Sequence, residues 1–384
     1  MASKQAPITG SVLEWAIRDR LTSIGFVADS AEVTESELRA WIYEDDQPTE
    51  TQLKRLAKTL RRPVSFFFLE QPPSHLPVAA EFRRFAGSSD RATQEALDAI
   101  NLARRIQKTH AWIRLRLEEN PIALPQLDVS ADIEESGENL RKWLDWSTDN
   151  QTGKKATDAS AAKVMRNRLQ SKGIITLSLT LDEDITRGFS LHNEWAPLVA
   201  VNTRDAQPAR LFSYAHELVH LCLGENAVCG TAGKKTGVER FCNRAGSALL
   251  MPRHAFLSFV SEQFRGSPVS TVRQVTRLKN HFRVSYRAAA IRAEQLNIAS
   301  PGLYDRIDAI AKVDMKPRGG RAAPGQVRDR PAIRVDQYGH EFVSTLFEAE
   351  RSGLLKRHQL TDLLRVSDKE LSKVKQLSAA GANA

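Results

Sequence analysis

The chain has 384 residues, a formal net charge of +9 and a sequence pI near 9.5. This length predicts two or three domains with enough apolar material for a buried core. No run of about eighteen apolar residues occurs, and no apolar stretch follows Met1, so we expect a cytoplasmic, soluble protein with no membrane partner. The odd number of cysteines (Cys222, Cys229 and Cys242) favours reduced thiols over a disulfide framework.

The first predicted domain, residues 1–72, has the pattern of a small helical bundle. Apolar residues recur at helical spacing, and Thr34, Pro48 and Thr49 mark helix starts. Between Ala28 and Glu50 there are eight acids and one base, and eight minus one leaves a net charge of −7. These acids are Asp29, Glu32, Glu35, Glu37, Glu44, Asp45, Asp46 and Glu50.

This charge has the wrong sign for a DNA-recognition helix, which must bring Lys and Arg to phosphates. Either the domain serves as a protein-docking or dimerisation surface, or DNA is bound elsewhere in the chain. The plainer alternative is an acidic face that is merely solvated.

Residues 73–158 are predicted to form a helical connecting region. The stretch from Pro72 to Pro77 closes the first domain, and an amphipathic helix is expected from about Ala92 to Glu119. Pro121 to Lys155 is expected to be irregular apart from a helix around Leu140 to Trp146. The predicted buried stripe of the long helix consists of Leu97, Ile100, Ala103, Ile106 and Ile113.

The third predicted domain, residues 159–298, makes the fold class α+β within a mostly helical chain. Ala159 to Ser171 is expected to be helical, and three strand-like segments follow: Gly173–Leu179, Arg187–Leu191 and Pro197–Asn202. We expect a small antiparallel sheet packed on helices. Its edge strand is suited to receive an extended substrate segment by strand addition.

His216-Glu217-Leu218-Val219-His220 is the most informative motif of the chain. Residues four apart lie on one face of a helix, so both imidazoles can reach one zinc ion, with Glu217 beside it as general base. The alternative is a helix that carries two histidines by chance. The apolar neighbours of the motif and a helix stop at Gly224 favour the zinc site, and with it peptide hydrolysis.

A hydrolytic zinc site has three protein ligands and one open position, so a third ligand is needed. Glu239, nineteen positions after His220, is our candidate. Asn243, one turn later, is expected to hydrogen-bond the far nitrogen of a ligand imidazole. Glu225 is the competing candidate, but it follows the helix stop directly and would have to fold back across the helix end.

Cys229 lies in the segment from Gly224 to Gly237, which we expect to be a loop between two metal-binding helices. Its thiolate is a candidate inhibitory fourth ligand that would keep the enzyme latent, with sulfur about 2.3 Å from zinc. The alternative is an ordinary small residue in a loop. Cys222 and Cys242 are poorer candidates because both fall within predicted helices.

Residues 299–384 are predicted to form a basic linker and a helical C-terminal module. Val269 to Leu296, just before this region, is expected to be helical with a turn near Arg283–Ser285. The stretch Lys316 to Arg334 has six bases against Asp329 alone, and Gly and Pro interrupt it. It serves either solubility or a DNA or RNA contact. Val343–Arg351 and His358–Lys375 are the predicted helices of the module.

The central motifs resemble the ImmA/IrrE-type metallopeptidases, whose core combines a glycine-containing strand, an apolar strand ending in Asn, HELxH, and ExxxN before LLMP. The resemblance implies a zincin-like core with His216, His220 and Glu239 as zinc ligands and Glu217 as general base. It covers roughly residues 160–295. The matching pieces are Arg187–Leu191, Pro197–Asn202, His216–His220 and Glu239–Pro252.

The first seventy residues are similar to the helix-turn-helix, XRE-type subgroup of this family. By this resemblance the protein is a zinc-dependent endopeptidase that cleaves an XRE-type transcriptional repressor in a stress or phage response. The alternative is a DNA-binding transcriptional regulator with a structural or silent zinc site, against which the intact Glu217 argues. The similar pieces are Val12–Ala16, Trp41, Pro48–Ala57 and Pro63–Phe68.

Overall fold

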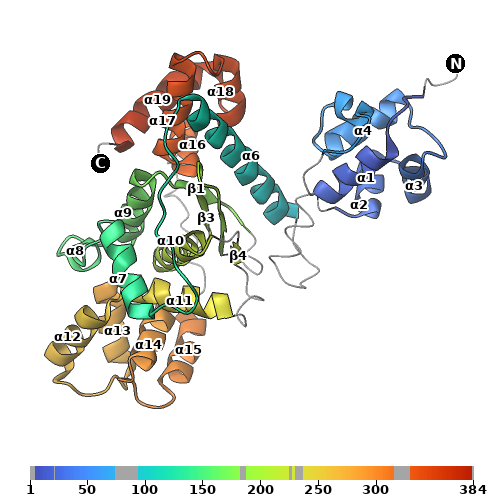
Figure 1. Ribbon diagram of the computed structural model, residues 1–384. Helices are drawn as coiled ribbons and strands as arrows, with labels where there is room; N and C mark the ends of the chain where they lie inside the picture. The colour runs from blue at the N-terminus through green and yellow to red at the C-terminus, as the bar shows by residue number, and fades with distance from the viewer. Residues whose placement is uncertain are drawn as a thin grey trace. The chain divides into compact units, whose positions relative to one another are not determined.

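The computed structural model describes residues 5–20, 22–73, 94–181, 187–224, 227–229, 237–314 and 329–382. The chain divides into two compact units, Met1–Asn101 and Leu102–Ala384. The fold is α+β and mostly helical, as the sequence predicts, and its described strands form one small sheet in the second unit (Figure 1).

The first unit is a bundle of short helices around an apolar core that includes Leu13, Trp41 and Phe67. Thr34 and Thr49 each form a capping box, which satisfies backbone N–H groups at the start of α3 and α4. These two predicted helix starts are therefore confirmed. The elements are α1 (Gly10–Asp19), α2 (Ile24–Ala31), α3 (Glu35–Tyr43), α4 (Glu50–Thr59) and the 3₁₀ helix η1 (Val64–Phe68).

The predicted long amphipathic helix is present as α6 (Gln94–Arg116). Its buried stripe is confirmed at Ile100, Ala103, Ile106 and Ile113, whereas the side chain of Leu97 lies outside the described residues.

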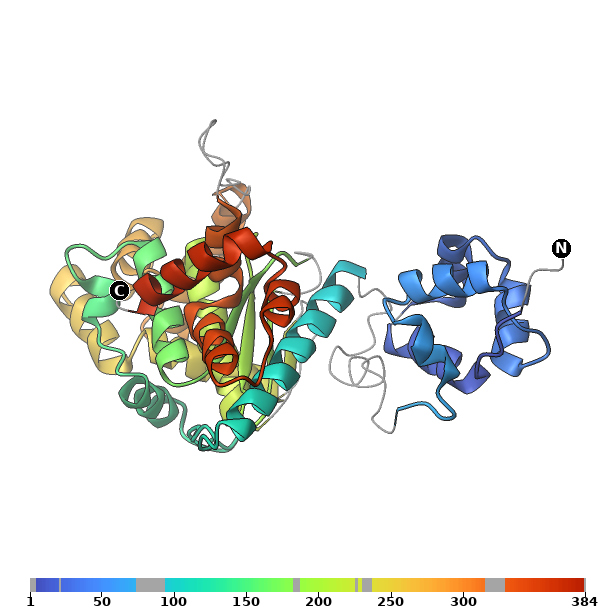
Figure 2. The ribbon, with the colours of Figure 1, turned by 90° about the horizontal axis from the view of Figure 1, so that it is seen from above.

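Two side chains from the part of α6 that belongs to the second unit hold the helix against the rest of that unit. Gln107 Nε2 donates hydrogen bonds to the carbonyl oxygens of Leu191 and Ala196, at 2.8 and 3.0 Å. His110 stacks on Phe342 of the C-terminal helices with ring centroids 5.6 Å apart, where α6 runs beside them (Figure 2).

The segment from Pro121 to Lys155 is more regular than the sequence suggested. The helix expected around Leu140–Trp146 is α7 (Ile133–Trp143), which begins earlier because the Asp132 carboxylate accepts a hydrogen bond from Glu135 N at 2.9 Å. A short helix, α8 (Asp149–Thr152), follows. The predicted helix at Ala159–Ser171 is confirmed as α9 (Asp158–Ser171).

The sheet has four strands in the order β1-β3-β2-β4. The pairs β2–β3 and β2–β4 are antiparallel, but β1 pairs with β3 in parallel, so the predicted antiparallel sheet is in fact mixed. The reason is topological: β2 and β3 form a hairpin, and β1 attaches to the far side of β3 in the same direction. The strands are β1 (Ile175–Leu179), β2 (Gly188–Leu191), β3 (Leu198–Asn202) and β4 (Ala227–Cys229).

Every residue of β1, β2 and β3 is buried. Such continuous burial is typical of strands covered on both faces rather than on one. At the end of β3 the Asn202 side chain bonds both the N–H and the carbonyl oxygen of Leu181, each at 3.1 Å. The asparagine that ends the apolar strand therefore ties the end of β3 to the chain that follows β1.

The helices after the sheet include the two that carry the HExxH motif and Glu239, namely α10 (Gln207–Cys222) and α11 (Gly237–Leu250). The predicted helical segment Val269–Leu296 is confirmed from Val272 onward, and its turn falls at Arg283, which has a φ of 54°. Val269 itself forms a parallel β-bridge with Ala299. The remaining helices here are α12 (Arg253–Phe264), α13 (Val272–Phe282), α14 (Tyr286–Gln295) and α15 (Leu303–Asp314).

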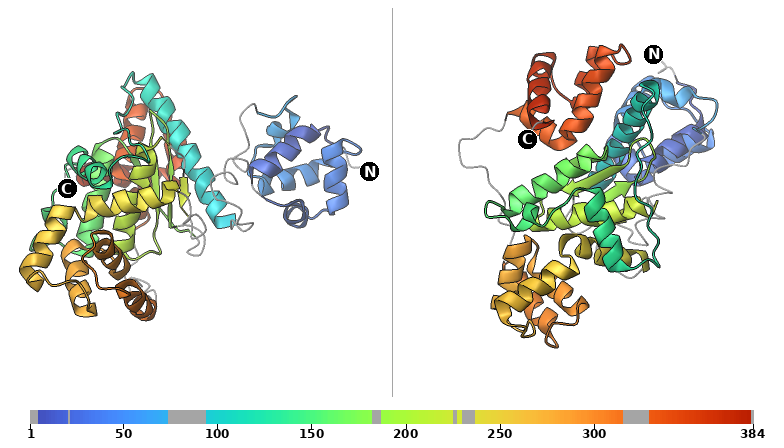
Figure 3. Two further views of the ribbon diagram at one scale, coloured as in Figure 1. Left: turned by 60° about the horizontal axis from the view of Figure 1, so that its bottom comes forward. Right: turned by 60° about the vertical axis from the view of Figure 1, so that its left-hand side comes forward.

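The predicted helical C-terminal module is present, with the sheet between it and α12–α15 (Figure 3). The basic stretch Lys316–Arg334 is not wholly irregular, because α16 begins at Arg330; residues 315–328 lie outside the described residues. Arg166 of α9 donates to the Asp336 carbonyl oxygen at 2.6 Å, which fixes α16 beside β1. The helices are α16 (Arg330–Tyr338), α17 (His340–Arg351), α18 (Arg357–Leu364) and α19 (Asp368–Ala382).

Among the described helices, none combines the length and the apolar character that crossing a membrane requires.

Candidate metal centre

Helix α10 presents the HExxH motif inside the second unit (Figure 1). Pro208 stands in its first turn, where a missing N–H costs nothing, and the helix ends at Cys222, just before Gly224 with a φ of 73°. The predicted helix stop is therefore confirmed. The apolar side chains of the helix, among them Leu211 and Leu218, belong to the main core cluster. The motif thus sits on a helix that packing holds on several sides.

The structure brings together the three predicted metal ligands. The Nε2 atoms of His216 and His220 are 3.2 Å apart. The carboxylate of Glu239, on the first turn of α11, lies 3.5 Å from His216 Nε2 and 3.3 Å from His220 Nε2. Four tetrahedral ligands at zinc bond lengths of about 2.0–2.1 Å would stand about 3.3 Å from one another. The cluster therefore has the spacing of three corners of a zinc tetrahedron.

No fourth histidine, cysteine, aspartate or glutamate joins this cluster among the residues that the structure describes. Catalytic zinc sites have three protein ligands and a fourth position for water or substrate. The side chains of Glu225 and Cys229 lie outside the described residues, so they do not enter this comparison. A borderline-soft divalent cation fits two imidazoles and one carboxylate.

Electrostatics favour the ligand form of Glu239. Burial alone would raise the pKa of its carboxyl group, but hydrogen bonds and charge interactions with His216 and His220 outweigh burial and lower the pKa below its ordinary value. The carboxylate is therefore ionised at neutral pH, as a metal ligand must be.

Glu217 is next to the ligand face of α10 and only 1% exposed. A residue that directly follows a ligand is rotated about 100° around the helix, which places it beside the site. On that side it faces Gly188 of β2: a Cβ at Gly188 would lie 3.3 Å from Glu217 Oε1 and 2.9 Å from the Ala200 carbonyl oxygen. The carboxylate and the strand backbone are therefore in close contact, and only glycine leaves room for it.

The only role predicted for Gly188 from the sequence is membership of a glycine-containing strand. A glycine inside an otherwise apolar strand is a general signal for a close approach to the backbone. Gly188 carries this signal, but the group that approaches its backbone is the Glu217 carboxylate of α10, which the glycine alone does not identify.

Asn243 is partly buried on α11, and no hydrogen bond between its amide and either ligand imidazole is found among the described contacts, so its orienting role stays a prediction. The competing ligand Glu225 lies outside the described residues.

The expected loop around Cys229 contains a strand, because the backbone of Cys229 belongs to β4 and is in register with Gly188 of β2. Its side chain lies outside the described residues, so the inhibitory ligand stays a prediction. Cys222 and Cys242 are buried and form no disulfide. Burial raises the pKa of the Cys222 thiol to about 12, which makes it a poor nucleophile at neutral pH.

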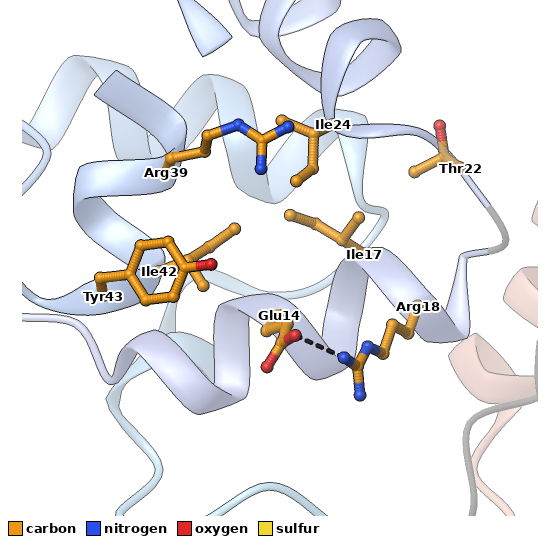
Figure 4. A pocket seen from close by; sticks show the side chains of 8 residues that line it. All are labelled: Glu14, Ile17, Arg18, Thr22, Ile24, Arg39, Ile42 and Tyr43. Carbon is orange, nitrogen blue, oxygen red and sulfur yellow. Dashed lines mark hydrogen bonds and ion pairs between the residues drawn. The ribbon is translucent and has the colours of Figure 1, made fainter. Parts of the chain in front are cut away.

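A second feature with polar and apolar lining lies in the first unit, between α1 and α3. This hollow of about 240 Å³ is lined by Ile17, Ile24 and Ile42, with the Glu14–Arg18 ion pair of 2.6 Å at its rim (Figure 4). It contains no histidine or cysteine and no group of metal-binding side chains. Among the described residues, the group of side chains that could hold a metal ion is the one on α10 and α11.

An HExxH helix with a carboxylate from a second helix is the arrangement of zinc peptidases. In agreement with this class, residues 169–294, about a third of the chain, match the family model of the IrrE N-terminal-like domain, Peptidase_M78. This region carries a peptidase-family domain and includes all three clustered residues. Searches of curated proteins and of solved structures found no match.

Proposed function

We propose that this protein is a zinc-dependent endopeptidase. The observation that carries the proposal is the cluster of His216, His220 and Glu239, whose ligand atoms lie 3.2 to 3.5 Å apart beside the buried carboxylate of Glu217. When bound, zinc would polarise the scissile carbonyl and lower the pKa of a water molecule.

In this mechanism Glu217 acts as general base. Its carboxylate takes a proton from the attacking water and later delivers that proton to the leaving amine nitrogen. Glu217 is 1% exposed, so its carboxylate lies inside the site and not in bulk solvent. The close contact with Gly188 restricts where the carboxylate can lie.

The sheet offers a way to bind an extended substrate segment. Its two edge strands are β1 and β4, and α16 packs beside β1. A substrate that joins the sheet would therefore pair with β4, whose register partner β2 carries Gly188 next to Glu217. Main-chain hydrogen bonds of such a complex would hold the peptide extended and near the zinc ligands.

We propose further that the substrate is an XRE-type transcriptional repressor cleaved in a stress or phage response. The support is the resemblance of the sequence to ImmA/IrrE-type peptidases together with the matched peptidase-family domain. The test is incubation of the zinc-loaded protein with the repressor from its own gene neighbourhood, followed by mass spectrometry of the fragments. Discrete cleavage that Glu217→Gln abolishes is the expected result; an intact repressor would refute this substrate.

The alternative, a DNA-binding regulator with a structural or silent zinc site, makes a different prediction. In that case removal of zinc would alter the fold or DNA binding, and Glu217→Gln would change neither. Circular dichroism and a DNA-binding titration of the metal-free protein separate the two functions.

A further inference from the structure

The end of α11 distant from the metal centre is held by two buried arginines. Arg292 of α14 is 1% exposed, and its Nε donates to the Met251 carbonyl oxygen at 2.9 Å. Arg141 of α7 is also buried, and its guanidinium donates to the Leu249 carbonyl oxygen at 2.6 Å. Leu249 belongs to the carboxyl end of α11 and Met251 directly follows it, where backbone carbonyls have no partner within the helix.

A third residue fixes the direction of Arg292. The two terminal nitrogens of Arg292 bind the two carboxylate oxygens of Glu134 on α7, at 2.8 and 2.6 Å. A bidentate pair of this kind sets the plane of the guanidinium as well as its position. Arg292 thereby links α7, α14 and the end of α11 in one rigid arrangement.

The backbones of α7 and α11 are also in close contact at the same place. A Cβ at Gly137 of α7 would lie 2.7 Å from the Cβ of Ala248 and 2.9 Å from Leu249 N. The carboxyl half of α11 therefore cannot rotate or slide without breaking a buried hydrogen bond or meeting α7.

Glu239 lies on the first turn of the same helix, about 15 Å from Leu249 at a rise of 1.5 Å per residue. A helix of this length moves as a rigid rod. With side chains reaching about 5–6 Å from the axis, a rotation of about 20° would move the Glu239 carboxylate by roughly 2 Å. That displacement is more than half of the 3.3 Å separation between this carboxylate and His220.

We propose that Arg292 and Arg141 are positioning residues for the metal centre: they fix the rotation and axial position of α11 and thereby hold Glu239 within reach of the ion. The inference rests on the proposed zinc site. It also gives a function to the partly buried Arg292–Glu134 ion pair, since burying an Arg–Glu pair is a weak source of stability compared with apolar packing.

The test compares zinc affinity with stability. Arg292→Lys keeps the charge but cannot bind both Glu134 and the Met251 carbonyl, and Arg141→Met removes the second arginine with little change in volume. Zinc affinity of the full chain is measured by competition with a chromophoric chelator, and melting temperature is measured on the metal-free protein. Leu346→Ala in α17, which opens a cavity in the C-terminal module, is the control for general loss of stability.

We expect each arginine variant to weaken zinc binding about 10- to 100-fold, as loss of supporting residues around metal ligands does. The control should leave zinc affinity unchanged at a comparable fall in melting temperature.

Unchanged zinc affinity in both arginine variants would overturn the inference, and so would an equal loss of zinc affinity in the Leu346→Ala control. If Arg292→Lys does not fold, Arg141→Met carries the test alone. Failure of the unaltered protein to bind zinc would refute the proposed function instead, so the two failures are distinguishable.

Discussion

Replacement of Gly188 by alanine tests the contact between β2 and the proposed general base. The added methyl group would lie 2.9 Å from the Ala200 carbonyl oxygen and 3.3 Å from Glu217 Oε1. Carbon atoms normally stand about 3.5–4.0 Å from non-bonded neighbours, so both contacts are too short. The Ala200 carbonyl belongs to the paired strand β3 and cannot move by itself, whereas the Glu217 side chain can.

The expected consequence is therefore a shift of the β2 backbone, which relieves the contact with Ala200, together with a displaced Glu217 carboxylate. Extra methyl groups in well-packed sites typically cost about 1–3 kcal/mol of stability. Displacement of a reacting group by about 1 Å can lower the rate of the chemical step about 100-fold. We expect Gly188→Ala to lower kcat/KM by about 10- to 100-fold, with zinc affinity within about threefold of the parent because no ligand is touched.

The assay is cleavage of the substrate at several concentrations, combined with a zinc titration of the same preparation. Ser178→Ala is the matched control: it also lies in the sheet, it is buried, and its hydroxyl has no hydrogen-bond partner among the described residues. It should leave kcat/KM unchanged. Parent-like kcat/KM in Gly188→Ala would refute the argument that the glycine makes room for Glu217.

Three further predictions concern the other proposed roles. Glu217→Gln should retain zinc and lower cleavage at least about 100-fold, whereas alanine at any of the three ligand positions should lose zinc; a Glu239→Ala protein that binds zinc as tightly as the parent would show that the third ligand is misassigned. The fragment Met1–Pro72 should bind duplex DNA no better than an unrelated acidic protein at physiological salt, and should associate with itself or with a protein partner; a salt-sensitive, sequence-selective complex in a gel-shift assay would contradict this. Cys229→Ser should raise basal cleavage if the thiolate is an inhibitory ligand, and an unchanged basal rate would remove that hypothesis.

The local features of this protein follow from short stretches of its sequence. The HExxH spacing determines that two imidazoles share one helical face, and the capping residues Thr34 and Thr49 determine where two helices begin. The sequence also predicts Glu239 as the third ligand, because a hydrolytic zinc site needs one, and the structure places its carboxylate 3.5 and 3.3 Å from the two imidazoles.

The early start of α7 was missed, although its signal was local. Asp132 and the acidic first turn after it form a helix start that the later apolar stripe concealed. In this stretch, which has few apolar residues, the Asp132 cap and the acidic first turn decide where the helix begins.

Other features were decided only by the tertiary structure. The parallel pairing of β1 with β3 depends on which side of the β2–β3 hairpin is free, and strand-like segments do not encode that choice. The contact of Gly188 with Glu217 and the bond between Arg292 and Glu134, 158 positions apart, likewise join distant parts of the chain. Local patterns fix which face an element buries, but the partner on that face is selected by packing of the whole unit.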